Sequence, residues 1–408
     1  MVASEVKFMI IRQKYLEKLK SYKDMQLIKV ITGIRRCGKS TLLKLYKDDL
    51  IKSGVDESQI KFINLEEKEN EHLKNVDNLY DYLKSNIVKD KMNYIFIDEV
   101  QECVNFQVAI DSLFVKDNID IYITGSNAHM LSGELATLLS GRYITIEVLP
   151  LSFEEYLQGV GSDNIESKYR DYLRFGGFPF ILQFKGNEDQ IRNYLDGLYN
   201  TIFKKDIVRK NKITNADALE NVTKFIFDNI GNLTTSKKIS DTLTSNNQKV
   251  SQPTVEGYLK ALVDSYFVSK VPRYDVKGKQ YLKSMAKYYV TDMGMRNYLL
   301  GYKNSNRGFI LENIVYLELI RRGYKVFIGK VDNGEIDFVV FKGSETIYIQ
   351  VSESIQDEST FEREMKPLRS VRDYNKRVVI STDYDVNESY DGIRHINILD
   401  FLLGKKDV

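Results

Sequence analysis

The stretch ITGIRRCGKSTLL, residues 31–43, places two glycines, a lysine and a serine between an apolar run and a helical pattern. Residues 25–33 are apolar and β-branched, which favours a strand, whereas residues 40–54 have helical spacing closed by a glycine. The order glycine, four residues, then Gly38-Lys39-Ser40 is the spacing of a phosphate-binding loop. In that setting backbone N–H groups turn toward phosphate oxygens, and the helix N-terminus adds its positive dipole end. We therefore predict a strand, a phosphate-binding loop and a helix.

This loop predicts the first set of nucleotide contacts. Lys39 is expected to reach the β- and γ-phosphates, and Ser40 is expected to place its hydroxyl on a Mg²⁺ ion that bridges them. The alternative explanation is a helix N-cap followed by an exposed lysine. The residues predicted to surround the phosphates are Gly33, Ile34, Arg35, Arg36, Cys37, Gly38, Lys39, Ser40 and Thr41.

A second motif lies where a nucleotide site requires one. NYIFIDEVQ, residues 93–101, is an apolar strand that ends in two acids. In a parallel sheet the carboxyl end of such a strand lies beside the phosphate loop, so we expect Asp98 to bind Mg²⁺. Glu99 points in a different direction from Asp98 and is suited to orient or deprotonate an attacking water. An acid that only caps the next turn is the alternative for Glu99.

Further candidates lie at the end of the next strand and at the start of the one after it. Thr124, Ser126 and Asn127 end the run IDIYITGSN and are candidates to sense the γ-phosphate, although they are equally suited to satisfy loop backbone groups. Arg142 heads another strand and is a candidate to stabilise charge on the transferred phosphoryl group, in cis or from a neighbouring subunit. A surface salt bridge is the alternative for Arg142.

Composition and strand spacing predict the architecture of residues 1–150. With 43% hydrophobic residues among 408, the chain is able to bury several cores, and a net charge of only +2 restricts any nucleic-acid surface to a local patch. Two distant cysteines argue against a disulfide framework or a zinc site, and favour a reducing cytosol. Strands near residues 28, 62, 95, 121 and 144, with helical stretches between them, predict a five-stranded αβα sandwich.

Five motifs taken together resemble a prokaryotic AAA-type ATPase family. They are GIRRCGKSTLL, IFIDEVQ, ITGSNAHML, LSGRYITIEVLPLSFEEYL and YLRFGGFPF, in the family's order and spacing. The resemblance covers nearly the whole chain, with a C-terminal domain of uncharacterised function, and it implies ATP and Mg²⁺ as ligands. Gly38, Lys39, Ser40, Asp98 and Glu99 match the family's nucleotide-site positions. Two residues upstream of the first strand are candidates for the base pocket: Arg12 and Tyr15.

The middle of the chain predicts a helical lid and a winged helix. Residues 151–212 have a helical pattern broken by FGGFP, which suits either a lid corner or a plain turn. Residues 213–303 read as helix, turn, helix and hairpin, the order of a winged helix-turn-helix that binds DNA. A protein-protein platform is the alternative. The basic residues expected to contact phosphates are Lys270, Arg273, Lys277, Lys279, Lys283 and Lys287, with Tyr274 and Tyr281 among them.

Residues 304–408 run as helix and three strands and resemble a Mg²⁺-dependent phosphodiesterase of the restriction-endonuclease class. Glu312 on the helix and Asp337 on a strand match two acids of that arrangement. Gln350 stands where the second strand acid belongs, and Ser352 stands where the lysine belongs. Because a neutral amide is a poor ligand for a hard cation and serine has no charge, we expect a nuclease-like fold without cleavage. Glu312 and Asp337 are then either residual metal ligands or structural acids at helix and strand ends.

These patterns predict an α/β protein that couples ATP binding and hydrolysis to DNA or a protein partner. A nucleotide-gated binding switch with slow turnover is the first alternative, and an active nuclease is the second. No apolar run is long enough to cross a membrane, so we expect a cytosolic protein, and subunit assembly is possible.

Overall fold

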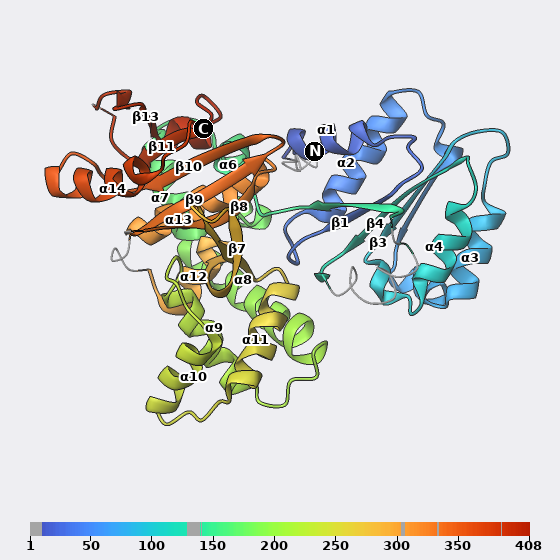
Figure 1. Ribbon diagram of the computed structural model, residues 1–408. Coiled ribbons are helices and arrows are strands. Elements are labelled where there is room, and N and C mark those ends of the chain that lie inside the picture. Colours follow the sequence, from blue (N-terminus) through green and yellow to red (C-terminus); the bar gives the residue numbers. More distant parts are fainter. Residues whose placement is uncertain (1–9, 129–138, 140, 303–306, 333, 385) are drawn as a thin grey trace. The chain divides into compact units, whose positions relative to one another are not determined.

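A parallel five-stranded sheet forms the centre of the first of two compact units in the computed structural model (Figure 1). This unit comprises residues 1–150 with residues 264–266, and the second comprises residues 151–263 and 267–408. The strand order is β2-β3-β4-β1-β5, and all four pairings are parallel. The predicted five-stranded parallel sheet is confirmed. Its strands are β1 (Ile28–Thr32), β2 (Ile60–Asn64), β3 (Asn93–Asp98), β4 (Ile119–Gly125) and β5 (Tyr143–Glu147).

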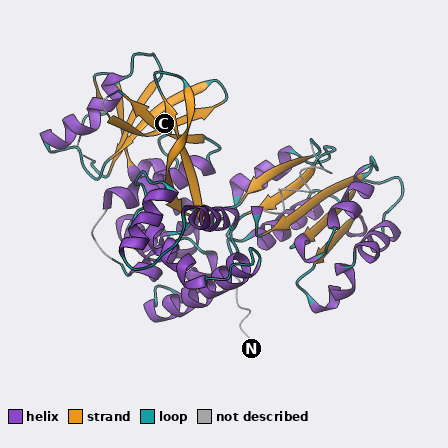
Figure 2. Ribbon diagram, turned by 60° about the horizontal axis from the view of Figure 1, so that its bottom comes forward, coloured by secondary structure: helices purple, strands orange, loops and turns teal. Residues whose placement is uncertain are grey.

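Helices cover both faces of this sheet (Figure 2). Ile28 and Val30 of β1 belong to an apolar cluster with α3 and α4, whereas the intervening Lys29 points to the other face. There Tyr46 of α2 packs against Tyr122 of β4. This alternation along one strand is what makes the unit a three-layer sandwich. The helices are α1 (Gln13–Ser21), α2 (Lys39–Lys52), α3 (Val76–Ser85) and α4 (Phe106–Phe114), with 3-10 turns at Glu57–Gln59, Lys68–Lys74 and Val100–Glu102.

The structure describes residues 10–128, 139, 141–302, 307–332, 334–384 and 386–408. Within these ranges no helix combines the length and the apolar character needed to cross a membrane. Part of the motif ITGSNAHML and the predicted boundary at residue 303 lie outside the described residues.

The second unit combines helices with an eight-stranded mixed sheet in the order β12-β13-β11-β10-β9-β8-β6-β7. Its first helices are α6 (Phe153–Val160), α7 (Ile165–Phe175), a 3-10 turn (Pro179–Phe184), α8 (Glu188–Thr201), a π-helix (Ile202–Arg209), α9 (Ala216–Asp228), α10 (Ser236–Ser245) and α11 (Gln252–Asp264). Then come β6 (Val268–Asp275), β7 (Gln280–Val290), α12 (Met293–Leu300), α13 (Arg307–Arg321), β8 (Lys325–Val331), β9 (Gly334–Lys342) and β10 (Glu345–Val351). The chain ends with α14 (Glu358–Ser370), β11 (Lys376–Ser381), β12 (Ser389–Tyr390), β13 (Ile393–Asn397) and α15 (Ile398–Leu402).

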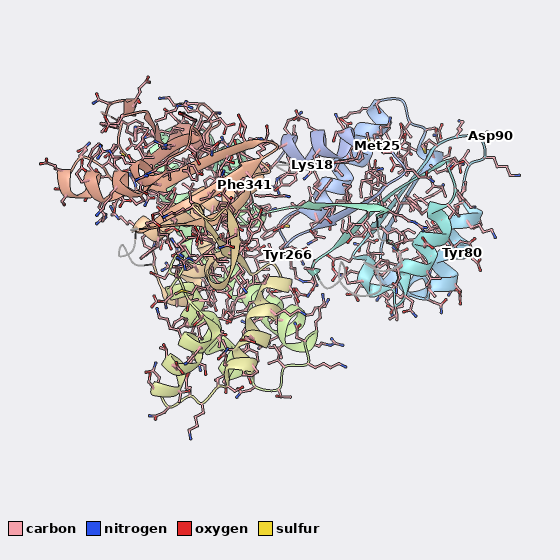
Figure 3. The ribbon with its side chains drawn as sticks, in the orientation of Figure 1. Lys18, Met25, Tyr80, Asp90, Tyr266 and Phe341 are labelled. Carbon is pink, nitrogen blue, oxygen red and sulfur yellow. The ribbon has the colours of Figure 1, made fainter. Side chains whose placement is uncertain are left out.

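The hairpin β6–β7 is part of this sheet and not a free wing. Residues 273–275 of β6 pair in parallel with residues 328–330 of β8. Aromatic side chains close the junction, since Tyr274 of β6 packs edge-on against Phe341 of β9, which is labelled in Figure 3. The division between the two units falls after residue 150, and residue 212 lies within the second unit. The subdivision of that unit into a lid, a winged helix and a nuclease-like domain stays a prediction.

The double glycine of FGGFP packs against α12 of the same unit. A Cβ on Gly176 would lie 2.2 Å from Oδ1 of Asp292, and the Gly177 N–H donates to Asp292 Oδ2 at 2.6 Å. The carboxylate also caps α12 by accepting from the Met295 N–H at 3.0 Å. Burial raises the pKa of Asp292 to about 6, although these backbone donors oppose the shift. The two glycines thus allow the backbone to turn tightly against the Asp292 carboxylate.

A buried ion pair joins strands β1 and β4 on the face of the first sheet that α2 covers. Lys29 Nζ of β1 lies 2.5 Å from Asp120 Oδ1 of β4, and both side chains are almost fully buried. The Tyr122 hydroxyl donates to Asp120 Oδ2 at 2.8 Å, and Lys29 also donates to the carbonyl of Met25, labelled in Figure 3. Burial lowers the pKa of Lys29 and raises that of Asp120, and the attraction between them opposes both shifts.

Asp120→Ala should lower the free energy of unfolding of the first unit by about 3–5 kcal/mol, because it leaves a buried ammonium without a counter-charge. Urea unfolding followed by circular dichroism measures this. The control is Asp49→Ala, which breaks a solvent-exposed pair with Lys20 and should cost less than about 1 kcal/mol. Equal losses in the two variants would contradict the importance of burial.

Candidate functional site

The predicted phosphate loop connects β1 to α2 and requires glycine at two positions. Gly33 has φ 139°, and a Cβ there would lie 2.2 Å from the Val148 carbonyl oxygen. Gly38 precedes α2 with φ 103°, in the left-handed region. Between them Arg36 also has a positive φ, of 66°. The chain thus curls tightly before the helix, and the first N–H groups of α2 face the loop without intrahelical partners.

Lys39 lies inside this loop. Its side chain is buried, and Nζ donates to the carbonyl oxygens of Gly33 at 3.0 Å and Ile34 at 3.2 Å. Three donors on one ammonium leave it able to exchange carbonyl partners for phosphate oxygens. An exposed lysine after an N-cap, the alternative explanation, does not describe this residue.

Asp98 ends β3 next to Ser40 and Thr124. The Thr124 hydroxyl donates to Asp98 Oδ1 at 2.5 Å, and the Ser40 hydroxyl is also hydrogen-bonded to the carboxylate. Burial raises the pKa of Asp98, while these two hydroxyls and the nearby Lys39 lower it. The structure thus brings together the residues for which we predicted phosphate and metal contacts.

Glu99 stands beside Asp98 but turns away from it, with a left-handed φ of 53°. Its N–H donates to the Thr124 hydroxyl at 2.8 Å, so one threonine contacts both acids. The Ser126 hydroxyl lies 2.8 and 3.1 Å from the two carboxylate oxygens, and Gln101 Nε2 donates to Oε2 at 2.5 Å. A positive φ is uncommon for glutamate. Where such backbone conformations do occur, they are concentrated at functional sites.

The remaining predicted loop and sensor residues differ in exposure. Ile34 and Cys37 are buried beneath the loop, whereas Arg36 and Thr41 are exposed. Arg35 pairs with Glu66 at 3.1 Å. Asn127 follows β4 and is buried. Sequence reasoning did not single out Gln101, although its place two residues after Glu99 was the available signal.

Arg142 lies at the opposite edge of the sheet. Its carbonyl oxygen accepts from the N–H of Ile28, the first residue of β1. The phosphate loop follows the other end of this strand. The guanidinium pairs with Asp111 of α4 and lies over Phe114. Within one chain Arg142 is therefore not brought to the phosphate loop, and its action from a neighbouring subunit stays a prediction.

Arg12 and Tyr15 support the loop from the side of α1. Arg12 donates to the carbonyl oxygens of Cys37 at 3.1 Å and Leu149 at 3.0 Å, and its guanidinium lies 4.6 Å from the Tyr15 ring centre. The Tyr15 hydroxyl accepts from the Leu149 N–H at 3.1 Å. Both side chains thus lie at the nucleotide-site edge of the sheet, and their contact with a base stays a prediction.

In the second unit, the residues expected at a phosphodiesterase site lie on neighbouring strands. Asp337 accepts from the Val351 N–H at 2.9 Å, and Gln350 Nε2 donates to Glu364 of α14 at 2.8 Å. The Ser352 hydroxyl donates to a backbone carbonyl. Among the described residues there is no group of three or more His, Cys, Asp or Glu suited to hold a metal ion.

One predicted phosphate contact is wrong. Lys287 is buried and lies 2.8 Å from Glu312 and 2.7 Å from Glu335, so it does not face solvent. Lys270, Lys277 and Lys279 are exposed as predicted, and Arg273 is half-buried. The side chain of Lys283 lies outside the described residues.

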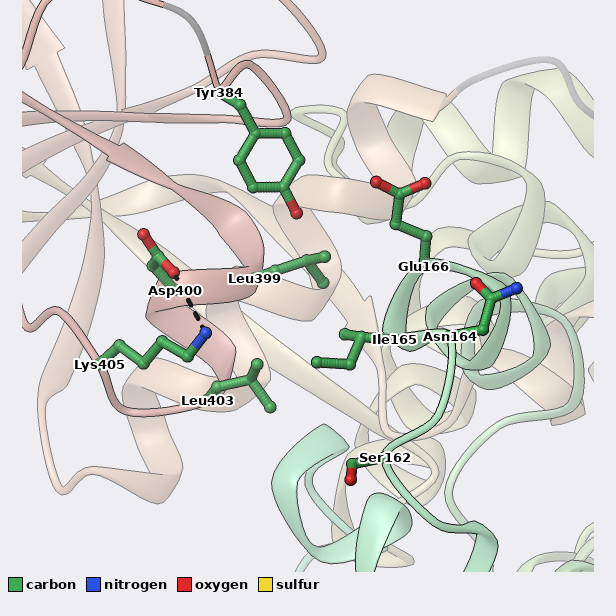
Figure 4. A pocket seen from close by; sticks show the side chains of 9 residues that line it. All are labelled: Ser162, Asn164, Ile165, Glu166, Tyr384, Leu399, Asp400, Leu403 and Lys405. Carbon is green, nitrogen blue, oxygen red and sulfur yellow. Dashed lines mark ion pairs between the residues drawn. The ribbon is translucent and has the colours of Figure 1, made fainter.

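The second unit also contains a pocket of about 350 Å³ between the turn before α7 and the segment around α15 (Figure 4). Its lining is mixed, with Ile165, Leu399 and Leu403 beside an ion pair of Asp400 and Lys405 at 3.8 Å. Its lining residues include no glycine. We therefore assign no chemistry to this pocket.

Two domain families match the chain. Residues 25–157 match the family described as AAA domain, and residues 166–306 match a domain of unknown function. An uncharacterized protein of Haemophilus influenzae is 38% identical over 402 residues, covering 97% of this chain and 99% of the relative. The chain belongs to the same family as that protein. This family extends to archaea, since an uncharacterized protein of Methanocaldococcus jannaschii is 33% identical, covering 83% of this chain and 77% of the relative.

A solved structure has a similar fold. A Walker-type ATPase of Pyrococcus abyssi superposes with a TM-score of 0.50 at 14% identity, covering 71% of this chain and 96% of that one. At this identity the likeness concerns the fold alone. The match at residues 25–157 supports an AAA-type P-loop ATPase domain in the first unit. None of these matches supports a nuclease-like fold for residues 304–408, which stays a prediction.

Lys39→Ala should weaken ATP binding by at least about tenfold, because it removes a charge-assisted donor from a buried loop. Fluorescence titration with a labelled ATP analogue measures the affinity. Lys44→Ala is the matched control, since Lys44 is an exposed lysine of the same helix. Unchanged affinity in Lys39→Ala would remove the phosphate-loop assignment.

Proposed function

We propose that this AAA-family protein binds ATP with Mg²⁺ and hydrolyses it at the edge of the parallel sheet where β1, β3 and β4 end. The observation that supports the proposal is that Lys39, Asp98 and Glu99, all buried, lie together at that edge. Lys39 begins α2, just after the loop that follows β1, whereas Asp98 and Glu99 lie at the end of β3. These two places meet because the strands of the first sheet are parallel.

The donor set suits a magnesium ion. The Ser40 hydroxyl and the Asp98 carboxylate are adjacent oxygen ligands of the hard kind that Mg²⁺ prefers. The ion would neutralise charge on the β- and γ-phosphates. In this assignment Lys39 leaves its loop carbonyls for phosphate oxygens, and Thr124 keeps Asp98 in place.

Glu99 is proposed to orient the attacking water and to accept its proton. Its carboxylate is held by Ser126 and Gln101, so its direction is fixed before the nucleotide binds. Preorganisation of this kind lowers the reorganisation needed during the reaction. A general base contributes about 10²–10⁴-fold to a rate.

Glu99→Gln should therefore reduce the ATPase kcat by about 100-fold or more while ATP affinity is retained, because the amide accepts no proton at neutral pH. Phosphate release under saturating ATP measures the rate. Glu102→Gln, in the same turn, is the control and should remain active. A nucleotide-gated switch with slow turnover is the rival, and it predicts that Glu99→Gln changes neither quantity.

We further propose that the second unit contacts DNA through α10, α11 and the β6–β7 hairpin. An antiparallel bridge between Thr234 and Ala286 ties the connection before α10 to the hairpin, as in a helix-turn-helix with a wing. Exposed lysines occur on all three elements and their connections, and they are Lys237, Lys238, Lys249, Lys260, Lys270, Lys277 and Lys279. The exposed Glu256 of α11 reduces their net charge, so a protein partner is the alternative.

The double variant Lys277→Ala/Lys279→Ala should reduce the slope of log affinity against log salt by about 2, since two phosphate contacts are lost. Fluorescence anisotropy with duplex DNA at several salt concentrations measures the slope. Lys366→Ala, an exposed lysine of α14, should leave it unchanged. If the wild type binds no DNA even at low ionic strength, these elements should be assigned to a protein partner.

A further inference from the structure

The ammonium group of Lys287 lies among three carboxylates in the second unit. Nζ is 2.8 Å from Glu312 Oε1, 2.7 Å from Glu335 Oε1 and 3.6 Å from Asp337 Oδ1. We call these four residues the Lys287 cluster. They come from β7, α13 and β9, and β7 is separated from β9 by two other strands in the sheet. The cluster therefore joins elements that backbone hydrogen bonds do not.

Strand periodicity explains how the cluster is built. Glu335 and Asp337 are two residues apart on β9, so both side chains leave the same face of the strand. Lys287 and Tyr289 have the same spacing on β7, and both contact Glu312, with the tyrosine hydroxyl donating at 2.5 Å. The alternation of side chains along the two strands thus places the donors Lys287 and Tyr289 and the acceptors Glu335 and Asp337 around Glu312.

The cluster is largely removed from water. The side chains of Lys287, Glu312 and Asp337 are 4%, 6% and 14% exposed, and Glu335 is 26% exposed. Burial raises the pKa of Glu312 and of Asp337, and the ammonium partly offsets both shifts. Burial lowers the pKa of Lys287, but the three nearby carboxylates outweigh it and raise the pKa above its usual value.

A cation surrounded by carboxylates from a helix and a strand is also the arrangement of a metal-dependent phosphodiesterase site. Here the neighbouring residue Gln350 is a neutral amide whose nitrogen donates to Glu364, and that acid is also paired with Arg363. The Lys287 ammonium contacts Glu312 and Asp337, the two acids that match the arrangement of that class. With the side chains as they lie, the described residues include no group of three or more His, Cys, Asp or Glu that could hold a metal ion. A metal ion on the same oxygens would lie within a few ångströms of the ammonium, and the two positive charges would repel each other.

We propose that the Lys287 ammonium is the built-in cation of this acidic site, so that the second unit holds no divalent metal ion there. The lysine then has two effects. It neutralises carboxylates that would repel one another, and it closes the site to the hard cation on which phosphodiester cleavage of this class depends. The proposal does not rest on the proposed ATPase activity, since every residue of the cluster belongs to the second unit.

The test is Mn²⁺ binding to the full chain in nucleotide-free buffer, measured by calorimetry and by the shift in melting temperature. The wild type should show no Mn²⁺ site that Asp337→Asn removes. Lys287→Ala should gain one Mn²⁺ per chain and a rise in melting temperature of about 5 °C at saturating metal, because the carboxylates lose their counter-charge. The double variant Lys287→Ala/Asp337→Asn should lose that gain.

Lys287→Arg is the matched control, because it keeps the positive charge and should gain no Mn²⁺ site. If Lys287→Ala is unfolded without metal, Mn²⁺ should restore its fold, and failure to do so would overturn the proposal. An Asp337-dependent Mn²⁺ site in the wild type would also overturn it. So would a folded Lys287→Ala that binds no extra Mn²⁺.

Discussion

One threonine hydroxyl holds together the candidate nucleotide site. Thr124 donates to Asp98 and accepts from the Glu99 N–H, so it fixes the first acid and the turned backbone of the second. This contact exists because β3 and β4 are parallel neighbours that end at the same edge. The phosphate loop reaches the same place because β1 is the other neighbour of β4. The proposed chemistry therefore depends on the order and direction of three strands.

The two units place charge in the interior in similar ways. Lys29 meets Asp120 across two adjacent strands of the first sheet, and Lys287 meets three acids across elements of the second. In both units, burying an ammonium group carries a desolvation penalty, which is offset only when acidic groups lie close to it and form hydrogen bonds with it. Such pairs tie strands and helices in a specific arrangement, because a displaced partner would leave a charge unpaired in an apolar interior.

The hairpin β6–β7 shows how an element can belong to two substructures. Its base carries the bridge to the connection before α10, and its outer part pairs with β8. A winged helix alone would leave the hairpin edge exposed, and the sheet covers that edge with another strand. The region of α10 and α11 and the C-terminal sheet therefore belong to one compact unit. For this reason we expect a conformational change in one of these two parts to displace the β6–β7 hairpin and thereby affect the other part.

Local patterns in the sequence were sufficient for the five-stranded sheet, the phosphate loop and the acids at the end of β3. Each of these depends on neighbours in the chain: apolar alternation, glycine conformation and residues just after a strand. The sequence did not reveal the partners of Gln101, the position of Arg142 or the burial of Lys287. These depend on which distant segments meet, and a lysine in a basic hairpin has the same local pattern whether it faces water or three carboxylates. Only the tertiary structure decided between those two environments, because burial and charge pairing are properties of the folded chain.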